Sequence, residues 1–406
     1  MNPSDCRRRL LLELLQAGLD RVSGRRCVAQ ALRESPLEPG PVWIAAIGKA
    51  AASMSLGARD ALGAAVERVF IVSKDGHVDA QTLLLPGITV HETAHPVPDA
   101  RSVAAGEALL SWLAAVPEHA RLLFLISGGS SSLIEVLEEG VTVEQLLQLN
   151  EAGLASGIPI AELNARRARL SRIKGGRLAA LLRGRPARAL FISDVPGDDP
   201  AVIGSGLMGP ASDGAPDNIE RTVIASLNHA TEAIGEAARK LGLDVHRPGA
   251  RFEGDAARLA VRFAHELHLN AAQLCVWGGE STVTLPEHPG RGGRNQHLAL
   301  AAARLLAGQP QMMLLAVGTD GTDGPTDDAG AIVDSETCAR ISLAELDADD
   351  CLRRADSGTA LAASGDLIQT GPTGTNVGDL VIGLKLSAEA ARIVWEGRDA
   401  PDASVL

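Results

Sequence analysis

Short apolar runs alternate with stretches of helical pattern along most of this chain, and this alternation restricts its fold more than any other feature. Four runs of strand length lie in the first half: VWIAAIG (42–48), RVFIVS (68–73), RLLFLIS (121–127) and RALFISD (188–194). Ala- and Leu-rich segments of helical length separate them, such as AAASMSLGARDALGAAV (50–66) and SVAAGEALLSWLAAV (102–116). The pattern is typical of parallel sheets whose strands are joined by right-handed helical crossovers.

A second series follows in the other half of the chain. It consists of QLCVWGGES (273–281), the helix NQHLALAAARLLAG (295–308), QMMLLAVGTD (311–320) and GDLVIGLKL (378–386). Before it, IERTVIASLNHATEAIGEAARKLG (219–242) is predicted to be helical. The chain has 406 residues, which is more than one ordinary core organises. We therefore predict an α/β fold: two Rossmann-like α/β domains with largely parallel sheets flanking an interdomain cleft, at residues 1–240 and 241–406.

Composition narrows the classes of function. A net charge of -12 and an aromatic content of 2% argue against nucleic acid as a partner. No apolar run approaches the ~18 residues of a membrane span. In CRRRLLLELLQAGLD (6–20), leucines recur at helical spacing and polar residues interrupt them, so we expect an amphipathic helix rather than a signal peptide. The five cysteines form no CxxC pair, which favours neither disulfides nor zinc. We expect a cytoplasmic protein.

Ligands of open parallel sheets bind outside the carboxyl ends of the strands, so the residues that follow the apolar runs are the candidates. The first such turn is AAIGKAAASM (45–54), where Gly48 and Lys49 lead into an Ala-rich helix. It is not a Walker A loop, because Trp43 and Ala50 occupy positions where that motif needs Gly and Ser or Thr. A lysine at a helix start can hold a phosphate or carboxylate. A solvated lysine on a turn is an equal alternative.

The second turn is LISGGSSSLIEV (125–136). Its glycines allow close approach of the backbone to a ligand, and its serines add hydroxyl donors at a helix start, which together favour an anion site. An ordinary serine N-cap explains one of these serines but less readily three in a row. The candidate ligand-binding residues here are Ser127, Gly128, Gly129 and Ser130.

A basic stretch follows in LNARRARLSRIKGGRLA (163–179). Such runs are usually solvated helix faces, but this one lies between loops that favour anions in an acidic protein. We therefore assign Asn164, Arg167 and Lys174 to a ligand or the interdomain cleft. Further on, GSGLMG (204–209) matches the dinucleotide motif by letters only, because no helix follows it. Asp194, at the end of a predicted strand, is a candidate catalytic or metal-binding carboxylate.

Two further loops carry charge in the second half. WGGESTVTL (277–285) presents Glu280, and GRGGRNQH (290–297) places Arg291, Arg294 and Asn295 on Gly-rich backbone before a helix. An arginine fork binds two oxygens of a phosphate at once, so we favour a phosphate-binding function over a bare loop.

The most acidic loop is GTDGTDGPTDDAGAIVD (318–334). It lacks the EF-hand pattern, whereas Mg²⁺ usually takes one or two protein carboxylates together with water and phosphates. We assign Asp320 and Asp323 as candidate metal ligands and expect the others to be solvated. Close to the last strand, TGPTGTNVGD (370–379) offers Thr373 and Asn376 to a nucleotide, although a simple turn explains it almost as well.

Taken in order, these loops resemble those of the class II glycerate kinases, the glycerate 2-kinase family whose C-terminal part is called MOFRL. The stretches that carry the resemblance are AIGKAAASM, LISGGSSSL, LNARRARLSRIKGGRLA, ISDVPGDDPAVIGSG, WGGESTVTL, GRGGRNQ, GTDGTDGPTDDAGAIVD and TGPTGTNVGDL. They span residues 45 to 380 in register. His297 stands where Glu is more common in this family, and Gly378 stands where Asn is common.

The resemblance implies ATP-dependent phosphorylation of D-glycerate at its 2-hydroxyl, giving 2-phosphoglycerate, with Mg²⁺. It maps the family's active-site lysine and arginine onto Lys49 and Arg294. Our hypothesis is in-line transfer in which Lys49 or an arginine holds the carboxylate and Asp194 accepts or orients the hydroxyl proton. Arg294, with Lys49 and the Ser130 loop, would offset charge on the phosphoryl group, and Asp320 or Asp323 would hold the metal.

Alternatives remain open at this stage. The chain can be a kinase for another hydroxy acid, or one that forms 3-phosphoglycerate. It can also be an NAD(P)H-dependent hydroxypyruvate reductase, a label given to some members of the family. The lack of a nicotinamide fingerprint in its proper context weighs against the reductase. The sequence leaves the oligomeric state open, a homodimer included.

Overall fold

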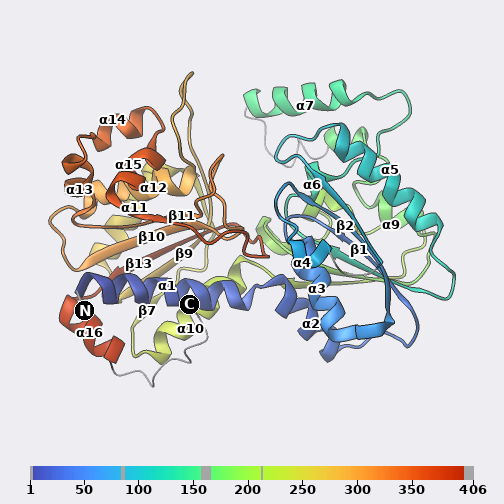
Figure 1. Ribbon diagram of the computed structural model, residues 1–406, viewed down its shortest axis with the longest axis horizontal. Helices are drawn as coiled ribbons and strands as arrows, with labels where there is room; N and C mark the ends of the chain where they lie inside the picture. Colours follow the sequence, from blue (N-terminus) through green and yellow to red (C-terminus); the bar gives the residue numbers. More distant parts are fainter. Residues whose placement is uncertain (1–2, 84–86, 157–165, 212–213, 397–406) are drawn as a thin grey trace. The chain divides into compact units, whose positions relative to one another are not determined.

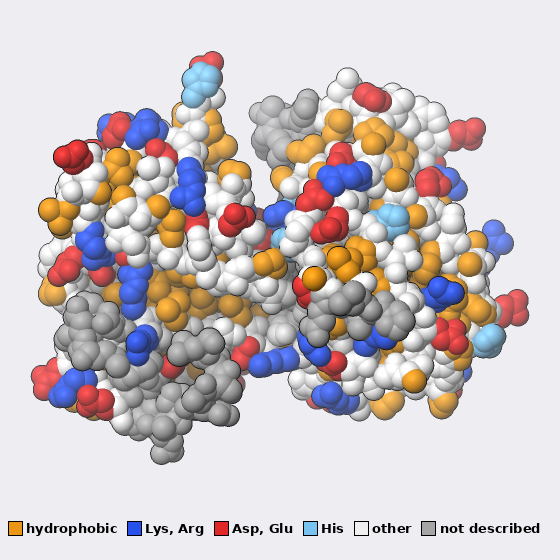
Figure 2. Space-filling model, in the orientation of Figure 1, with side chains coloured by type: hydrophobic (Ala, Val, Ile, Leu, Met, Phe, Trp, Pro, Cys, Tyr) orange, Lys and Arg blue, Asp and Glu red, His pale blue; other side chains and the backbone are white. Residues whose placement is uncertain are grey.

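The computed structural model describes residues 3–83, 87–156, 166–211 and 214–396 (Figure 1). They form two compact units. The parallel-sheet unit comprises Val22–Ser226 and Gly374–Val377. The mixed-sheet unit comprises Met1–Arg21, Leu227–Thr373 and Gly378–Leu406. Acidic and basic side chains are interspersed over the visible surface of each unit (Figure 2).

The parallel-sheet unit is built on six parallel strands in the order β3-β2-β1-β4-β5-β6. The strands are β1 (Val42–Ile47), β2 (Val66–Lys74), β3 (Ile88–Thr93), β4 (Arg121–Ile126), β5 (Ala187–Ile192) and β6 (Ile219–Ala225). Apolar side chains of the inner strands β2, β1, β4 and β5 are buried on both faces, as helix-covered parallel sheets require, whereas those of the edge strands β3 and β6 are mostly half-buried. The strand order reverses between β1 and β4, and such a switch point is where open α/β sheets bind ligands.

The helices of this unit connect its strands. They are α2 (Gly24–Glu34), α3 (Ala51–Leu62), η1 (Gly63–Ala65), α4 (Ala80–Leu83), α5 (Ala100–Ala114), α6 (Ser130–Leu133), α7 (Val143–Ser156), α9 (Arg177–Leu181), η2 (Pro196–Asp198) and η3 (Ile203–Gly206). Local chemistry sets some of their starts. Helix α5 begins with a capping box in which the Asp99 side chain and Ser102 satisfy each other's backbone N–H groups.

The mixed-sheet unit has seven strands. They are β7 (Val245–His246), β8 (Phe252–Asp255), β9 (Leu274–Thr282), β10 (Met312–Gly318), β11 (Gly330–Asp334), β12 (Leu367–Ile368) and β13 (Asp379–Lys385). The sheet order is β12-β11-β10-β13-β9-β7, and β8 also pairs with β9. Its helices are α1 (Pro3–Arg21), α10 (Leu227–Lys240), α11 (Ala256–Leu269), α12 (Arg294–Leu306), α13 (Thr337–Leu343), α14 (Ala348–Arg353), α15 (Ser357–Ser364) and α16 (Ala388–Glu396). Helices α1, α10 and α16 pack together on one side of the sheet, and α11 to α15 cover the other (Figure 1).

The α/β class is confirmed, but the expectation of a largely parallel sheet holds only for the first unit. In the second, β9, β13, β10, β11 and β12 pair antiparallel in turn, and only β7 and β8 run parallel to β9. The acidic loop returns the chain directly from β10 to β11, so these neighbours must be antiparallel. A buried strand is apolar in either direction, which is why the sequence pattern did not show this.

Two strands of the parallel sheet, β6 and β3, also differ from expectation. The helix predicted over 219–242 begins only at Leu227, because 219–225 form strand β6. The β-branched residues Thr222, Val223 and Ile224 favour that strand. Strand β3 was not predicted at all.

The N-terminal segment forms the expected amphipathic helix, α1, which buries Leu10, Leu11, Leu14 and Leu15. It packs on α10 within the mixed-sheet unit, where a Cβ on Gly18 would lie 2.8 Å from the Ile234 side chain. The boundary between the two units therefore crosses the chain more than once. The division into a domain at residues 1–240 and a domain at 241–406 stays a prediction. None of the described helices combines the length and hydropathy that a membrane crossing needs.

Candidate active site

Two turns meet at the switch point of the parallel sheet. Lys49 follows β1, and its backbone N–H donates to the Gly128 carbonyl, which follows β4, at 3.0 Å. The backbone N–H of Ala50 donates to the Ser127 hydroxyl at 3.0 Å. Since β1 and β4 are parallel neighbours, their carboxyl ends lie at the same edge of the sheet. The topology therefore brings together the two turns that the sequence singled out.

Glycines at these turns make room for polar side chains. Gly48 has a φ of +125°, and a Cβ there would lie 2.2 Å from the Ser127 hydroxyl. A Cβ on Gly128 would lie 2.0 Å from Oδ2 of Asp194 and 2.2 Å from Nδ2 of Asn376. Asn376 in turn donates from Nδ2 to Asp194 Oδ2 at 3.0 Å. Only glycine at position 128 lets this carboxylate approach the turn.

His95 is a neighbour of this group that sequence reasoning missed. A Cβ on Gly129 would lie 3.1 Å from Cγ of Lys49 and 3.2 Å from Cδ2 of His95. Both side chains therefore flank the same glycine. His95 lies just beyond strand β3, and recognising that strand would have placed it at a carboxyl end with the other candidates.

Lys174 occupies a different position from the one expected. Its ammonium contacts Oε2 of Glu135 at 2.5 Å and donates to the Ser131 carbonyl at 2.6 Å, and the exposed fractions of the Lys174 and Glu135 side chains are only 2% and 1%. Burial lowers the pKa of Lys174, while Glu135 opposes that shift. The enclosed lysine supports the serine turn from behind and does not face a ligand.

The GSGLMG segment (204–209), which matches the dinucleotide motif by letters only, also supports the serine turn. Ser205, at a φ of +59°, donates from its hydroxyl to the Ser131 hydroxyl at 3.0 Å. The Ser130 hydroxyl is buried and has no hydrogen-bond partner among the described residues.

Of the other candidates in the basic stretch, Arg167 is half-buried, and burial lowers the pKa of its guanidinium. Asn164 lies outside the described residues.

Arg294, at the start of α12, forms the charged centre of the mixed-sheet unit. Its Nε and Nη2 donate to the two carboxylate oxygens of Asp379 at 2.7 and 2.9 Å. Its Nη1 lies 3.2 Å from Oε1 of Glu280. The β9–β13 register places Asp379 opposite Gly279, so Glu280 and Asp379 are necessarily close. Burial alone would lower the pKa of Arg294, but Asp379 and Glu280 raise it above its usual value.

A pocket of about 370 Å³ adjoins this centre. Its lining includes Glu280, Ser281, Gly293, Arg294 and His297. His297 is 9% exposed, burial lowers its pKa, and its Nδ1 has no hydrogen-bond partner among the described residues. The imidazole is therefore neutral near pH 7 and cannot replace a carboxylate in charge.

Asp323 of the acidic loop caps helix α12. Its two oxygens accept the backbone N–H groups of Asn295 and Gln296 at 3.0 and 2.8 Å. Burial raises the pKa of Asp323 to about 7, although these hydrogen bonds oppose the shift. This carboxylate therefore supports the start of helix α12, and its role as a metal ligand stays a prediction. Asn295 itself is 1% exposed and donates from Nδ2 back to Asp323, so it supports the cap.

Other residues of the acidic loop are also engaged. Asp320 Oδ1 accepts the N–H and hydroxyl of Thr322 at 3.0 and 3.2 Å, and Thr373 donates its hydroxyl to the Thr319 carbonyl at 2.5 Å. Arg291 pairs with the fully buried Asp328. Within the described ranges, no group of three or more His, Cys, Asp or Glu side chains is placed to hold a metal ion. Asp320 is thus engaged within the loop, whereas Asp323 and Asp328 are engaged by residues 291–296.

A Rossmann-type strand order with polar, Gly-rich turns at its switch point defines an α/β enzyme for small polar substrates. Residues 10–238 match a family model described as a domain of unknown function, DUF4147, and residues 273–379 match the MOFRL family. The chain is 34% identical to a D-glycerate 2-kinase of Thermotoga maritima, over 93% of this chain and 98% of that one. The chain belongs to the glycerate 2-kinase family, as its loops predicted.

Two further comparisons extend this result. The crystal structure of a glycerate kinase from Thermotoga maritima has a TM-score of 0.82 at 33% identity, covering 93% of this chain and 99% of that one. The chain is also 35% identical, over 82% of its length and 96% of the relative's, to an Agrobacterium vitis protein that carries a hydroxypyruvate reductase name. Both names therefore occur among proteins similar to this chain.

Proposed function

We propose that this enzyme phosphorylates D-glycerate at its 2-hydroxyl with ATP, giving 2-phosphoglycerate and ADP. Relatives named for glycerate 2-kinase activity support the reaction. The structural observation that carries it is the meeting of Lys49, the Gly128–Gly129 turn and Asp194 at the switch point. A cation, open backbone and a carboxylate are the parts that an anionic hydroxy acid requires.

Candidate residues for this chemistry occur in both units. In the parallel-sheet unit, Lys49 binds an anionic group and Asp194, oriented by Asn376, accepts or orients the hydroxyl proton. In the mixed-sheet unit, Arg294 has five N–H groups, of which three face Asp379 and Glu280. The other two can donate to phosphoryl oxygens, where charge accumulates in the transition state.

The kinase family implies a nucleotide as second substrate, and Mg²⁺ would accompany it to offset phosphate charge. Both oxygens of Asp323 accept N–H groups of helix α12, which leaves each oxygen a further lone pair or fewer for a metal. Asp320 and Asp323 remain our candidate ligands, with phosphate oxygens and water completing the shell, since Mg²⁺ needs few protein carboxylates. A homodimer and a cytoplasmic location also remain predictions.

The reductase is the second candidate, because one relative carries that name and the strand order is that of dinucleotide-binding folds. The turn after β1 lacks the required glycine pattern. The GSGLMG segment contains three consecutive left-handed residues, Gly204, Ser205 and Gly206, and opens no α-helix. These observations weigh against a nicotinamide site.

A coupled assay with D-glycerate, ATP and Mg²⁺ tests the proposal, using enolase without phosphoglycerate mutase to detect product. Signal with enolase alone identifies 2-phosphoglycerate. ADP without enolase signal would indicate 3-phosphoglycerate or another product. Absence of ADP, together with hydroxypyruvate-dependent loss of NAD(P)H absorbance, would replace the kinase with the reductase.

A further inference from the structure

An exposed carboxylate in the mixed-sheet unit lies between two arginines. Glu280, near the end of β9, has Oε1 3.2 Å from Nη1 of Arg294 and Oε2 3.6 Å from Nη2 of Arg251. Arg251 immediately precedes β8, which pairs with β9, and Arg294 begins α12. The fold therefore brings two guanidinium groups to one carboxylate from separate elements.

The two carboxylates at Arg294 are held very differently. Asp379 is fully buried and forms a two-pronged hydrogen-bonded pair at 2.7 and 2.9 Å. The Glu280 side chain is 50% exposed, and its 3.6 Å contact with Arg251 is beyond hydrogen-bond length. Loose, solvated ion pairs contribute little stability, so water or another anion can replace Glu280 at small cost. Asp379, which is buried and paired through both oxygens, cannot be replaced in this way.

Charge defines what can take the place of Glu280. Asp379 keeps its two contacts with Arg294, whereas Glu280 contacts both arginines. When Glu280 turns away, Arg251, Arg294 and Asp379 together carry one net positive charge. The Arg294 and Arg251 side chains are 39% and 17% exposed, so a ligand can reach them. Planar guanidinium groups recognise the paired oxygens of carboxylates and phosphates.

We propose that Arg251 and Arg294 form an oxyanion clamp and that Glu280 is its resting counter-ion, displaced when substrate binds. The clamp rests on the proposed function, because that reaction brings two oxyanions to the enzyme. These are the carboxylate of D-glycerate and the phosphates of the nucleotide. Glu280 thus occupies the place of a substrate oxyanion and does not itself bind the substrate.

Two substitutions with opposite expected signs test the clamp. Arg251→Gln removes a positive charge and should raise the KM of one substrate about tenfold, with kcat nearly unchanged. Glu280→Gln removes the competing carboxylate and should lower the same KM about two- to fivefold. The substrate whose KM moves, D-glycerate or ATP, identifies the oxyanion.

A matched control pair joins helix α12, which Arg294 begins, to helix α14. Arg304 pairs with Asp349 at 2.6 Å, and both side chains are about half exposed. Arg304→Gln and Asp349→Asn change charge equally and should leave both KM values as in the wild type. Circular dichroism and melting temperature establish that each variant is folded, and Arg251→Lys provides a second test with the charge retained and the fork lost.

Several outcomes would overturn the clamp. If Arg251→Gln behaves like Arg304→Gln in an active kinase, the clamp is wrong and the kinase stands. If Glu280→Gln lowers kcat a hundredfold or more, Glu280 takes part in the chemistry and is not a counter-ion. If wild-type protein shows no kinase activity, thermal shift with D-glycerate and with ADP decides. If a ligand raises the melting temperature of the wild type but not of Arg251→Gln, the clamp stands and the kinase proposal falls. If neither ligand raises the melting temperature of the wild type, both proposals fall.

Discussion

Each unit holds a basic side chain against a buried carboxylate, and the two pairs differ in how they meet solvent. In the parallel-sheet unit, Lys174 and Glu135 are both enclosed, with side chains 2% and 1% exposed. In the mixed-sheet unit, Asp379 is equally buried, but the Arg294 side chain is 39% exposed. The first pair can act only on the protein around it. The second presents a cation whose position is fixed from behind and whose outer N–H groups can meet a ligand.

This difference in exposure distinguishes a pair that stabilises the fold from a pair that can take part in catalysis. Breaking the enclosed pair should cost stability and leave the folded enzyme's turnover largely intact. Breaking the open pair should cost turnover first. Four substitutions test how far the exposure of an ionic group determines its role.

The largest effect is expected from Lys174→Met. It leaves Glu135 buried without its cation, which typically costs about 3–5 kcal/mol of unfolding free energy. Urea denaturation measures the loss. Replacing both partners, in Lys174→Met with Glu135→Leu, should recover most of it, because no uncompensated charge remains. A hundredfold fall in kcat at unchanged stability would show instead that Lys174 meets substrate.

Arg294→Gln should act mainly on turnover. Loss of a preorganised donor to the developing charge costs about 2.7–4 kcal/mol of transition-state stabilisation, or 10²–10³ in kcat. Because the substitution also strands Asp379 in the interior, stability should fall as well. The double variant with Asp379→Asn separates the two effects, restoring stability while kcat stays low. Near-normal turnover in either variant would contradict the assigned role.

The sequence predicted which loops hold the candidate residues of the site, but not which of their side chains are exposed and which are buried. Lys49 and Asp194 were correctly placed at one edge of the sheet, because parallel neighbouring strands bring their carboxyl ends together, a consequence of topology alone. Lys174 was misplaced because its partner Glu135 lies 39 residues earlier, and nothing local to a basic run reveals a buried carboxylate. The outward or inward direction of a charged side chain depends on tertiary packing.

The same reason explains the other differences. Asp323 was predicted to bind metal because it lies in an acidic, Gly-rich loop, yet it caps α12 from a distant part of the sequence. The antiparallel pairing of β10, β11 and β13 was missed because apolar composition records burial and not direction. Patterns along the chain therefore gave the layers of the fold, and long-range pairing decided the details of the site.

Asp323 extends the comparison to a buried carboxylate that pairs with N–H groups rather than a cation. Its pKa is raised by burial from 3.8 to about 7, so between these pH values the folded protein keeps a proton that the unfolded chain has lost. Unfolding free energy should therefore fall as pH rises through that window, by up to about 1.4 kcal/mol per pH unit from this group. The fall should stop above pH 7.

Asp323→Asn measures this contribution by difference. Its carbonyl oxygen can still accept one helix N–H, but the side chain does not titrate. Denaturation at a series of pH values from 4 to 8 should show a flatter profile for the variant than for the wild type. Parallel profiles would mean that Asp323 is ionised throughout and that the N–H groups of Asn295 and Gln296 fully offset its burial.

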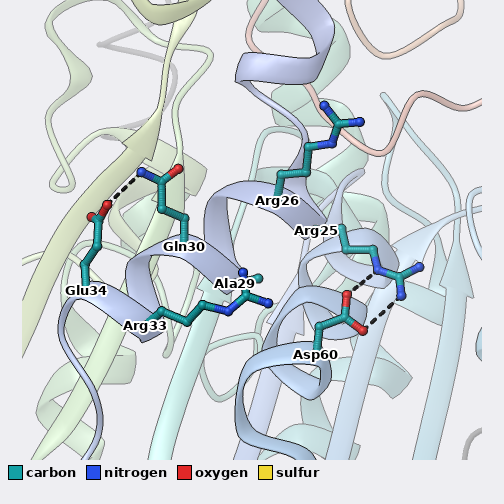
Figure 3. Close-up of a pocket in the computed structure, with 7 residues that line it drawn as sticks. All are labelled: Arg25, Arg26, Ala29, Gln30, Arg33, Glu34 and Asp60. Atoms are coloured by element: carbon teal, nitrogen blue, oxygen red, sulfur yellow. Dashed lines mark hydrogen bonds and ion pairs between the residues drawn. The ribbon is translucent and has the colours of Figure 1, made fainter. Parts of the chain in front are cut away.

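The smallest effect on stability is expected where both members of an ion pair are exposed to solvent. Helices α2 and α3 border a surface pocket of about 660 Å³ in which Arg25 binds Asp60 through Nε and Nη2, at 2.5 and 2.9 Å (Figure 3). The geometry is as regular as that of Arg294 and Asp379. The two side chains, however, are 49% and 37% exposed. Solvated pairs of this kind typically contribute about 0.2–1 kcal/mol.

Arg25→Ala should therefore change unfolding free energy by less than about 1 kcal/mol and leave kcat unaltered. High salt should reduce even this difference, since it screens exposed charges and leaves the buried carboxylates almost untouched. Denaturation at low and high ionic strength, beside Lys174→Met, makes the measurement. A loss comparable to that of Lys174→Met would mean that hydrogen-bond geometry, and not exposure, decides the contribution of an ion pair in this protein.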